Sequence, residues 1–363
     1  MKIGFLNATY SLTSTGGGSA HIRQFVNLAC ELGHEIWSYG SIERSGCRSY
    51  SHKRIKRLAE LKTTDCFYHR IQGPIPDSIL WWQAKWKQWI APAPQVWEWN
   101  TVPEFGMLSG KTKTQIAEER AKWRQLAKLC NLSICVSATM VDYLGELGFK
   151  NCLVVPNGSD PERFGSDVKP CDRIAEYPTS CNVVWIGSGD ISWHDFETIR
   201  KVALQFASRK DAQVDFHIIG SGLRDLHSAP KNLHYHGQVS YQHLPNWLAG
   251  TQVGIIAYKD GPAMHSSPLK LFDYMASGLA VISTEQPQVR EILSEVGLQD
   301  NVVPLADHAA LSDLIVRLAK SPTLASQQGR KLRELVIKKY TWRRNAETIL
   351  GAIHELVMPN SNG

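Results

Sequence analysis

The stretch SSPLKLFDYMASGLAVIST, residues 266–284, decides the fold more than any other part of the sequence. The Ser-Pro pair near its start favours a helix with Ser267 as the N-cap. Apolar residues at helical spacing extend this helix over residues 270–276, and Gly278 ends it. The apolar run at residues 280–283 then predicts a buried strand. A helix that leads directly into a buried strand is typical of parallel α/β sheets.

Two charged side chains on this predicted helix indicate a nucleotide site. Lys270 lies in the first turn, where a cation opposes the helix dipole and is unfavourable unless an anion binds there. The unpaired N–H groups of the same turn are suited to a diphosphate. Asp273 follows about one turn later on the same face, where its carboxylate can accept hydrogen bonds from two vicinal ribose hydroxyls. The alternative is a buried helix with a surface Lys–Asp pair.

Strands alternate with helices on both sides of this stretch, which predicts parallel sheets covered by helices. In the first half we expect strands at residues 2–7, 34–40, 65–71, 95–100, 133–137 and 152–156, and helices at residues 19–33, 79–90 and 114–129. In the second half we expect strands at residues 182–186, 215–219, 233–236, 253–257 and 280–283, and helices at residues 196–208, 241–249, 270–276 and 288–294.

Two domains follow from the chain length and from one loop-rich segment. The 363 residues are too many for one ordinary core. The segment between Pro161 and Pro178 is rich in Pro, Gly and Asp and is interpreted as a linker. We therefore expect an N-terminal Rossmann-like domain over residues 1–165, a C-terminal Rossmann-like domain over residues 166–340, and a helix in residues 341–363 that can return to the N-terminal domain.

A glycine-rich loop joins the first predicted strand to the first predicted helix. Residues 16–19 read GGGS, and glycines let a phosphate approach the backbone at a helix N-terminus. The pattern differs from G-x-G-x-x-G followed by an acidic residue, which disfavours a nicotinamide site. A mobile glycine turn is the alternative. Residues 156–160, PNGSD, predict a tight turn and nothing more.

The excess positive charge lies in the first half of the chain. Residues 1–165 contain 20 Lys and Arg against 14 Asp and Glu, a net charge of +6, whereas the rest is neutral. Basic residues are dense over residues 44–62, and the predicted helix at residues 79–90 carries four tryptophans and two lysines. Together they give the hypothesis that the N-terminal domain docks on an anionic membrane surface. The alternatives for the basic stretch are a solvated face and a site for an anionic acceptor. Those for the helix are burial in the core and an aromatic platform for the acceptor.

Several function classes are disfavoured by what the sequence lacks. No apolar run approaches the ~20 residues of a membrane span, and no apolar segment of signal-peptide kind starts the chain. The eight cysteines show neither metal-ligand spacing nor a disulfide framework, so we expect a cytoplasmic protein with reduced thiols. No nucleic-acid recognition motif accompanies the basic residues. The absence of any Asp-Xaa-Asp motif agrees with chemistry that needs no metal.

The motifs of the chain, taken in their order and spacing, resemble the retaining glycosyltransferases of family four, also called group 1. The stretches that carry the resemblance cover nearly the whole chain and are GGGSAHIRQFVNLACELGHEI, DCFYHR, VWEWN, ICVSATMVDYLGELG, VVPNGSDPERF, VWIGSGDISWHDF, FHIIGSG, HGQVSYQHLPNWLAGTQVGIIAY and SSPLKLFDYMASGLAVIST. The resemblance implies the GT-B fold, an α/β architecture of two Rossmann-like domains that face an interdomain cleft. It also implies transfer of a sugar from a UDP- or GDP-linked donor to a glycan or lipid-linked acceptor, without a cofactor.

The resemblance also implies roles for particular residues. Gly17 and Gly18 would approach the donor diphosphate. Asp273 occupies the second acidic position of the family's E-x7-E motif and would hold the ribose. The residues that would hold the phosphates are Ser267, Leu269 and Lys270. Those that would line the N-terminal side of the cleft, at the carboxyl ends of strands, are Arg70, Glu98 and Asn100.

Three positions depart from the family pattern. The first acidic position of E-x7-E is His265, and the two cations that normally stabilise the departing diphosphate are replaced by Ser188 and His194. Lys270 would then carry more of that charge, helped by a protonated His194. These departures leave two other hypotheses open: a non-catalytic protein that binds nucleotide sugars, and a sugar-nucleotide epimerase or hydrolase on the same fold.

Overall fold

The structure of the chain is a computed structural model, and it describes residues 1–6, 17–39, 48–50, 62–71, 93–165, 167–222 and 229–358. The chain divides into two compact units. Unit 1 comprises Met1–Asn157, His265–Ser267 and Trp342–Gly363, and unit 2 comprises Gly158–Met264 and Pro268–Thr341. The first boundary follows Asn157 instead of residue 165, and the C-terminal helix belongs to unit 1.

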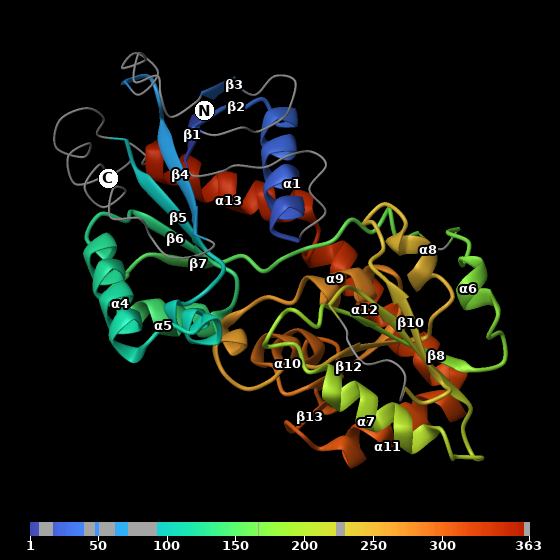
Figure 1. Ribbon diagram of the computed structural model, residues 1–363. Coiled ribbons are helices and arrows are strands. Elements are labelled where there is room, and N and C mark those ends of the chain that lie inside the picture. Colours follow the sequence, from blue (N-terminus) through green and yellow to red (C-terminus); the bar gives the residue numbers. More distant parts are fainter. Residues whose placement is uncertain are drawn as a thin grey trace. The chain divides into compact units, whose positions relative to one another are not determined.

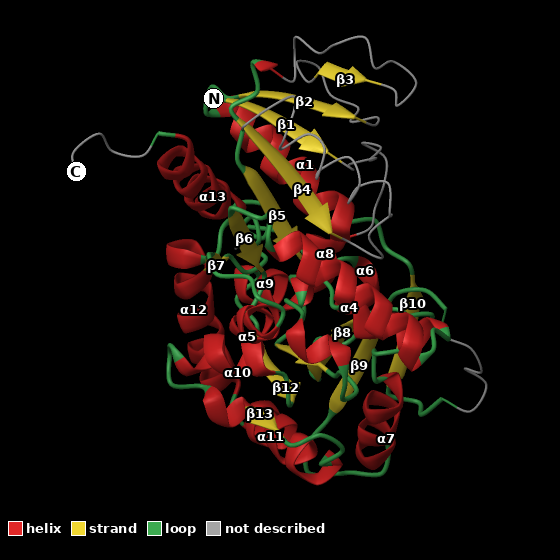
Figure 2. Cartoon of the chain, turned by 90° about the vertical axis from the view of Figure 1, so that its left-hand side faces the viewer, coloured by secondary structure: helices red, strands yellow, loops and turns green. Residues whose placement is uncertain are grey.

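Unit 1 is built on a seven-stranded parallel sheet with the order β3-β2-β1-β4-β5-β6-β7 (Figure 1). Its strands are β1 (Lys2–Leu6), β2 (Glu35–Tyr39), β3 (Arg48–Tyr50), β4 (Cys66–Ile71), β5 (Gln95–Trp99), β6 (Leu132–Cys135) and β7 (Cys152–Val154). Its helices are α1 (Gly17–Glu31), η1 (Pro103–Ser109), α4 (Lys113–Ala127), α5 (Ala138–Glu146) and α13 (Trp342–Val357). The helix α13 packs along α1 (Figure 2).

Tryptophan rings fill the core of unit 1 beside β5. Trp97 and Trp99 point to the same face because strand side chains alternate, and their rings stack 5.8 Å apart between centroids. The ring of Trp123, from α4, lies 4.4 Å from that of Trp99. All three side chains are fully buried. Rings of this size each bury 150–250 Å², roughly, so they dominate the packing of this unit.

Unit 2 is built on a six-stranded parallel sheet with the order β10-β9-β8-β11-β12-β13. Its strands are β8 (Cys181–Ile186), β9 (Val214–Ile219), β10 (Leu233–Gly237), β11 (Val253–Ile256), β12 (Ala280–Thr284) and β13 (Val302–Val303). Its helices are α6 (Asp172–Ala175), α7 (Phe196–Phe206), α8 (Leu244–Leu248), η3 (Pro262–His265), α9 (Leu269–Ala276), α10 (Pro287–Ser294), η4 (Gln299–Asn301), α11 (His308–Lys320) and α12 (Pro322–Lys339).

Helices cover both faces of the unit 2 sheet. On one face, alternate strand residues such as Val183 and Ile255 join apolar residues of α7 and α11 in the hydrophobic core. On the other face, α9 lies against β11, where Gly254 leaves the room that the ring of Tyr274 occupies. This two-faced burial explains why the strands read as apolar runs in the sequence.

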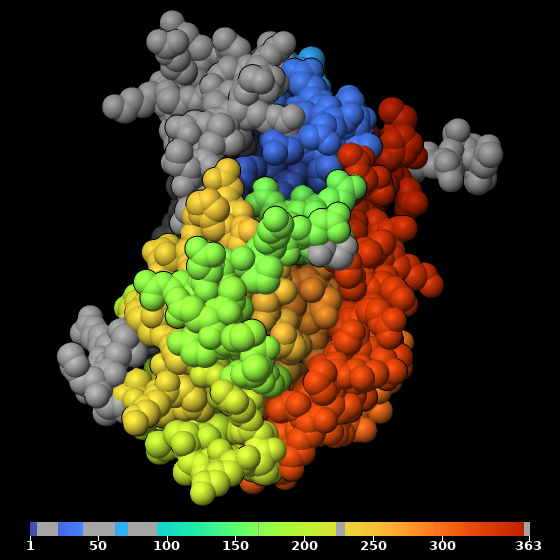
Figure 3. Space-filling view, turned by 90° about the vertical axis from the view of Figure 1, so that its right-hand side faces the viewer, coloured from blue at the N-terminus to red at the C-terminus, as the bar shows by residue number. Residues whose placement is uncertain are grey.

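The segment that the sequence predicts as a linker is a folded part of unit 2. It contains the short helix α6, and the N–H of Cys171 just before it donates to the carbonyl oxygen of Asn246 in α8 (2.9 Å). Gly250 leaves room for the side chain of Ile174. In Figure 3 the green surface of this segment accordingly lies against the yellow surface of the α8 region. The interpretation of residues 161–178 as an open linker is therefore wrong.

Both sheets have the strand order of a Rossmann domain, as the sequence predicts. The predicted helix at residues 79–90 and nearly all of the basic stretch at residues 44–62 lie outside the described residues. In the part of the chain that the structure describes, no helix combines the length and apolarity needed to cross a membrane.

Candidate functional site

The site in unit 2 lies at the carboxyl ends of β8 and β11, where the strand order reverses direction. This topological switch point is where open α/β sheets bind ligands. The segment after β8 turns back to β11, because the N–H of Asp195 donates to the carbonyl oxygen of Ala257 (3.1 Å). An isolated β-bridge joins His194 to Tyr258. The fold thus brings side chains that follow two different strands to one edge of the sheet.

Lys270, in the first turn of α9, is buried at this edge without a hydrogen-bond partner. The residue is 7% exposed, and within the described residues its Nζ atom has no hydrogen bond. Nζ lies 5.1 Å from the ring centroids of both Trp185 and Tyr258. Burial lowers the pKa of Lys270 to about 7. A buried ammonium group without a counter-charge is costly, so the arrangement is suited to an anionic ligand.

Ser188 and His194 lie together, and the His194 ring is next to Tyr258, one of the two rings near this lysine. The N–H of Ser188 donates to His194 Nδ1 (3.0 Å), and the His194 ring stacks on that of Tyr258 with centroids 5.4 Å apart. Burial, followed by the charge of Lys270, lowers the pKa of His194 to about 3. The lowered pKa favours the neutral ring in the absence of a bound anion, and the role of His194 in holding the phosphates stays a prediction. Its burial beside a lysine was not apparent from the sequence.

Asp273 is buried one turn further along α9, with two hydroxyl groups bound to one of its oxygens. Ser159 donates to Oδ1 (2.7 Å), and Tyr241 donates to the same atom (3.3 Å). The guanidinium of Arg163 lies over the Tyr241 ring, 5.0 Å from its centroid. Burial raises the pKa of Asp273 to about 7, against the effect of both hydroxyl donors. The carboxylate is thus held in one orientation, and it gains from any further hydrogen-bond donor.

The N-terminus of α9 has no side-chain cap, because Ser267 is engaged elsewhere. The N-cap is Pro268, and Ser267 Oγ accepts a hydrogen bond from the N–H of Asn157 (3.0 Å). The Asn157 side chain also donates to the Ser267 carbonyl oxygen (2.7 Å). The prediction that Ser267 caps the helix is therefore wrong. Helix geometry leaves the N–H groups of Leu269 and Lys270 without an intrahelical acceptor.

Two glycine loops meet at the same edge of the sheet. A Cβ atom on Gly220, just after β9, would overlap the carbonyl oxygen of Gly187, just after β8. A Cβ atom on Gly222 would overlap the carboxylate of Asp190, and Gly222 has a φ of +70°. Glycine at these positions therefore lets the two loops meet, and the hydroxyl oxygens of Ser188 and Ser221 lie 3.2 Å apart across them.

The Gly220→Ala substitution should lower the free energy of unfolding by about 1–3 kcal/mol, because a backbone carbonyl cannot move aside as a flexible side chain does. Urea unfolding measures the effect. The control is Gly351→Ala in α13, where the new Cβ meets nothing within 4 Å. Equal stability of the two variants would contradict the packing argument.

Unit 1 contains a buried polar network centred on Glu98. Its Oε1 accepts from Arg70 Nε (3.0 Å) and from the Asn100 side chain (3.0 Å), and its Oε2 accepts from the Tyr68 hydroxyl (2.7 Å). His21 Nε2 lies 3.4 Å from Oε1. These partners outweigh the burial of Glu98 and lower its pKa to about 2. The structure thus brings Arg70, Glu98 and Asn100 together, with Arg70 ion-paired inside the unit.

Gly17 and Gly18 are the first two residues of α1 in unit 1. Their N–H groups lack intrahelical acceptors by helix geometry, as an anion site at this helix end requires. The role of these two glycines therefore stays a prediction.

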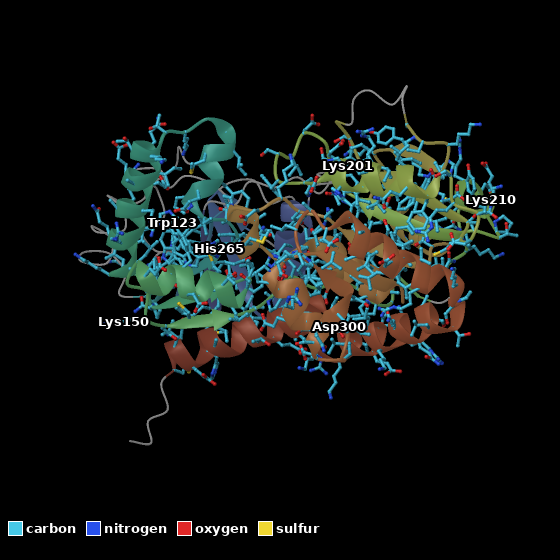
Figure 4. The ribbon with its side chains drawn as sticks, turned by 90° about the horizontal axis from the view of Figure 1, so that it is seen from below. Trp123, Lys150, Lys201, Lys210, His265 and Asp300 are labelled. Carbon is cyan, nitrogen blue, oxygen red and sulfur yellow. The ribbon has the colours of Figure 1, made fainter. Side chains whose placement is uncertain are left out.

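His265 lies in the short segment His265–Ser267 that belongs to unit 1. Its Nδ1 atom lies 3.1 Å from the carbonyl oxygen of Thr139, and its own carbonyl oxygen accepts from Ser137 Oγ (2.8 Å). Its ring centroid is 5.3 Å from that of Tyr143, which in turn packs on Trp123. Figure 4 shows His265 and Trp123 near one another. The residue at the first acidic position of the motif is therefore anchored to α5.

A second polar cluster lies on β9 and β10 of unit 2. His217 Nδ1 lies 3.0 Å from His236 Nε2, and His217 Nε2 lies 3.1 Å from Asn182 Oδ1. His234 Nε2 lies 2.6 Å from Asp215 Oδ1. Burial lowers the pKa of His217 to about 3 and that of His236 to about 4. Over the described residues, no group of His, Cys, Asp or Glu is placed to hold a metal ion.

These histidines should make unit 2 sensitive to acid. Their unfolded pKa is about 6.5, so below that pH the unfolded chain binds protons that the native state does not. Stability is thus fully present above pH 6.5 and is lost as the pH falls toward 4. The His236→Gln substitution should make the slope of the unfolding free energy against pH smaller, by the amount that corresponds to about one proton. Urea unfolding between pH 7.5 and 5 measures the slope, with the exposed His243→Gln as control. An unchanged slope in His236→Gln would contradict the assignment.

The two aromatic rings near Lys270 and the hydroxyl partners of Asp273 were not identified from the sequence. Trp185 and Tyr258 come from different strands, and nothing in their spacing indicates that both rings face one lysine. Ser159 lies in the PNGSD turn, which was interpreted as turn chemistry alone, and yet it binds Asp273.

Comparison with known proteins finds similarity to glycosyltransferases. Residues 200–351 match the profile of the family described as glycosyl transferase-like. TuaH of Bacillus subtilis strain 168, a protein assigned to teichuronic acid biosynthesis as a glycosyltransferase, is 23% identical over 260 residues. The matched region is 67% of this chain and 62% of TuaH, less than two thirds of that relative's length.

Solved structures show the same fold over the whole chain. Sucrose-phosphate synthase from Thermosynechococcus elongatus has a TM-score of 0.75 at 15% identity and covers 99% of this chain and 100% of its own. HepE from Anabaena, in complex with UDP-glucose, has a TM-score of 0.71 at 13% identity, with coverage of 98% and 100%. WaaG, a glycosyltransferase involved in lipopolysaccharide biosynthesis, has a TM-score of 0.66 at 11% identity, with coverage of 99% and 100%. The chain has the GT-B fold, as the sequence predicts.

Proposed function

We propose that this chain, in which residues 200–351 belong to the glycosyl transferase-like family, is a group 1 glycosyltransferase that moves a sugar from a nucleotide donor to an acceptor. The observation that carries the proposal is the buried Lys270, which has no hydrogen-bond partner in the described part of the chain. It lies in the first turn of α9, at the switch point of a Rossmann sheet, where a diphosphate supplies the missing counter-charge.

In this proposal α9 binds the donor through two of its side chains and its first-turn amides. Lys270 and the N–H groups of Leu269 and Lys270 bind the diphosphate. Asp273 binds the ribose, and because its Oδ1 atom already accepts from Ser159 and Tyr241, we assign the ribose hydroxyls to Oδ2. Ser188 and His194 lie at the edge of the phosphate site as neutral hydrogen-bonding groups.

The reaction that fits this site is hexosyl transfer with retention and without a metal. The bond between the anomeric carbon and the phosphate oxygen breaks, and the anomeric carbon bonds to the acceptor oxygen. The acceptor hydroxyl gives its proton to the departing phosphate. Negative charge grows on the diphosphate during this step, and fixed N–H groups with a buried lysine stabilise it.

The donor and acceptor are proposed by class. The structure of HepE that resembles this chain contains UDP-glucose, which supports a UDP-linked donor, with a GDP-linked donor as the alternative. TuaH and WaaG are named for the biosynthesis of teichuronic acid and lipopolysaccharide, which supports a glycan or lipid-linked acceptor. We place the acceptor in unit 1 and the reaction in the cytoplasm, with peripheral contact between unit 1 and an anionic membrane.

A non-catalytic nucleotide-sugar-binding protein is the second candidate. The observation that favours it is the neutral state of His194 beside Ser188, at the positions where the family has two cations. A sugar-nucleotide epimerase or hydrolase is the third candidate, on the same fold.

Incubation of the full chain with UDP-, GDP- and ADP-linked sugars, with and without sugar acceptors, tests the proposal by product analysis. A transferase yields nucleoside diphosphate and a lengthened acceptor, and it does so only when acceptor is present. An epimerase or hydrolase converts the donor alone. A binding protein raises its melting temperature with one donor and forms no product. Either of the last two results would overturn the proposal.

A further inference from the structure

Among the residues that the structure describes, no group near Lys270 can neutralise its charge. Trp185 of β8 and Tyr258 after β11 contribute aromatic rings, and His194 is neutral. Burial lowers the pKa of Lys270, and no carboxylate among the described residues raises it again. Asp273 on the same helix is directed to Ser159 and Tyr241.

A charged ammonium in such a place loses its hydration and gains only the attraction of two rings. Cation–π contacts offset only part of the cost of burying an unpaired charge. The neutral amine avoids this cost, since it needs no counter-charge. A diphosphate reverses the balance, because two negative groups beside Nζ favour the ammonium form.

We propose that Lys270 is an uncharged amine in the empty site and that a bound diphosphate brings a proton with it. The inference rests on the proposed donor site and adds to it a coupling between donor binding and proton uptake. The lowered pKa of Lys270, about 7, agrees with this and sets the pH range in which the coupling acts.

The sign of the pH dependence follows from the linkage between proton and ligand. Above pH 7 the empty site has lost its proton, so binding must take one up, and the Kd should rise about tenfold per pH unit. Below pH 7 the amine is already charged, and the Kd should be nearly independent of this group. Release of the diphosphate product is therefore favoured by higher pH.

Asp273 introduces a proton movement of opposite sign. Its pKa is raised to about 7, and ribose hydroxyls favour its ionised form, so binding releases a proton from it near neutral pH. At pH 8 the empty site has Asp273 mostly ionised and Lys270 mostly neutral. At this pH, binding therefore releases almost no proton from Asp273, and the proton taken up by Lys270 dominates the net exchange.

Calorimetric titration of the full chain with UDP-glucose at pH 8, in two buffers of different ionisation enthalpy, counts the protons directly. UDP-glucose is chosen because its phosphate groups do not titrate near neutral pH. Wild type should take up close to one proton per site. Lys270→Arg, whose guanidinium stays charged, should take up none. The control Lys201→Arg alters an exposed lysine of α7 and should behave as wild type.

Tight binding of UDP-glucose by wild type with no proton uptake would overturn the inference, as would equal uptake by Lys270→Arg. Where Lys270→Arg does not fold, Lys270→Met should bind weakly and take up no proton. The Kd of wild type from pH 7 to pH 9 gives a second measurement, and a constant Kd contradicts the coupling. If neither UDP-glucose nor GDP-mannose binds wild type at any pH, the proposed donor site fails first, and the inference fails with it.

Discussion

Replacing Lys270 with methionine should lower kcat by about 10²–10³-fold while the protein stays folded. Methionine has a similar length and suits the aromatic surroundings of Trp185 and Tyr258, so the buried site keeps its packing. What the variant loses is the cation that we propose to lie beside the departing diphosphate. Steady-state release of nucleoside diphosphate, measured with the donor that wild type accepts, gives the loss.

The matched control for this experiment is Lys201→Met, which removes an exposed lysine of α7 in the same unit. It should leave kcat unchanged. Circular dichroism and the thermal midpoint establish that both variants are folded. Turnover of Lys270→Met at the wild-type rate would show that the lysine has no role in the reaction, and the phosphate assignment would have to move to another residue.

The Glu98→Leu substitution should destabilise unit 1 by about 3–5 kcal/mol. It removes the carboxylate that accepts from Arg70, Asn100 and Tyr68, and with it the buried ion pair between Glu98 and Arg70. Glu98 is 2% exposed, so water cannot replace these contacts. Urea unfolding followed by tryptophan fluorescence measures the change, since Trp97 and Trp99 report on the same sheet.

Glu31→Gln is the control for this prediction within unit 1. Glu31 pairs with Arg343 on the surface, where both side chains are more than half exposed, and such pairs contribute less than about 1 kcal/mol. A loss in Glu98→Leu no larger than that in Glu31→Gln would mean that the network around Glu98 does not hold unit 1 together.

Most of the fold follows from the sequence because the strands of a doubly covered parallel sheet are apolar throughout. Strands such as β8 and β9 were predicted to within one residue, for this reason. The two-residue strand β13 was missed because it is too short to give a pattern. The boundary between the units was placed too late, because residues 161–178 have a loop composition and yet contain α6.

The sequence predicts part of the site. The rest depends on contacts between residues that are far apart in the chain. The charge of Lys270 in a helix first turn is a local signal, and the sequence contains it. The burial that leaves this lysine without a partner, and that keeps His194 neutral, depends on Trp185 and Tyr258 from other elements. The N-cap at Ser267 was wrong for a similar reason, since Asn157, 110 residues earlier, binds its hydroxyl.

The central claim is that the donor diphosphate binds at the N-terminus of α9, and a crystal structure of the full chain with UDP tests it most directly. The account predicts phosphate oxygens about 2.7–3.1 Å from Lys270 Nζ and from the N–H groups of Leu269 and Lys270. It also predicts the ribose hydroxyls at Oδ2 of Asp273. A diphosphate bound elsewhere, with Lys270 Nζ still unpaired between Trp185 and Tyr258, would contradict it.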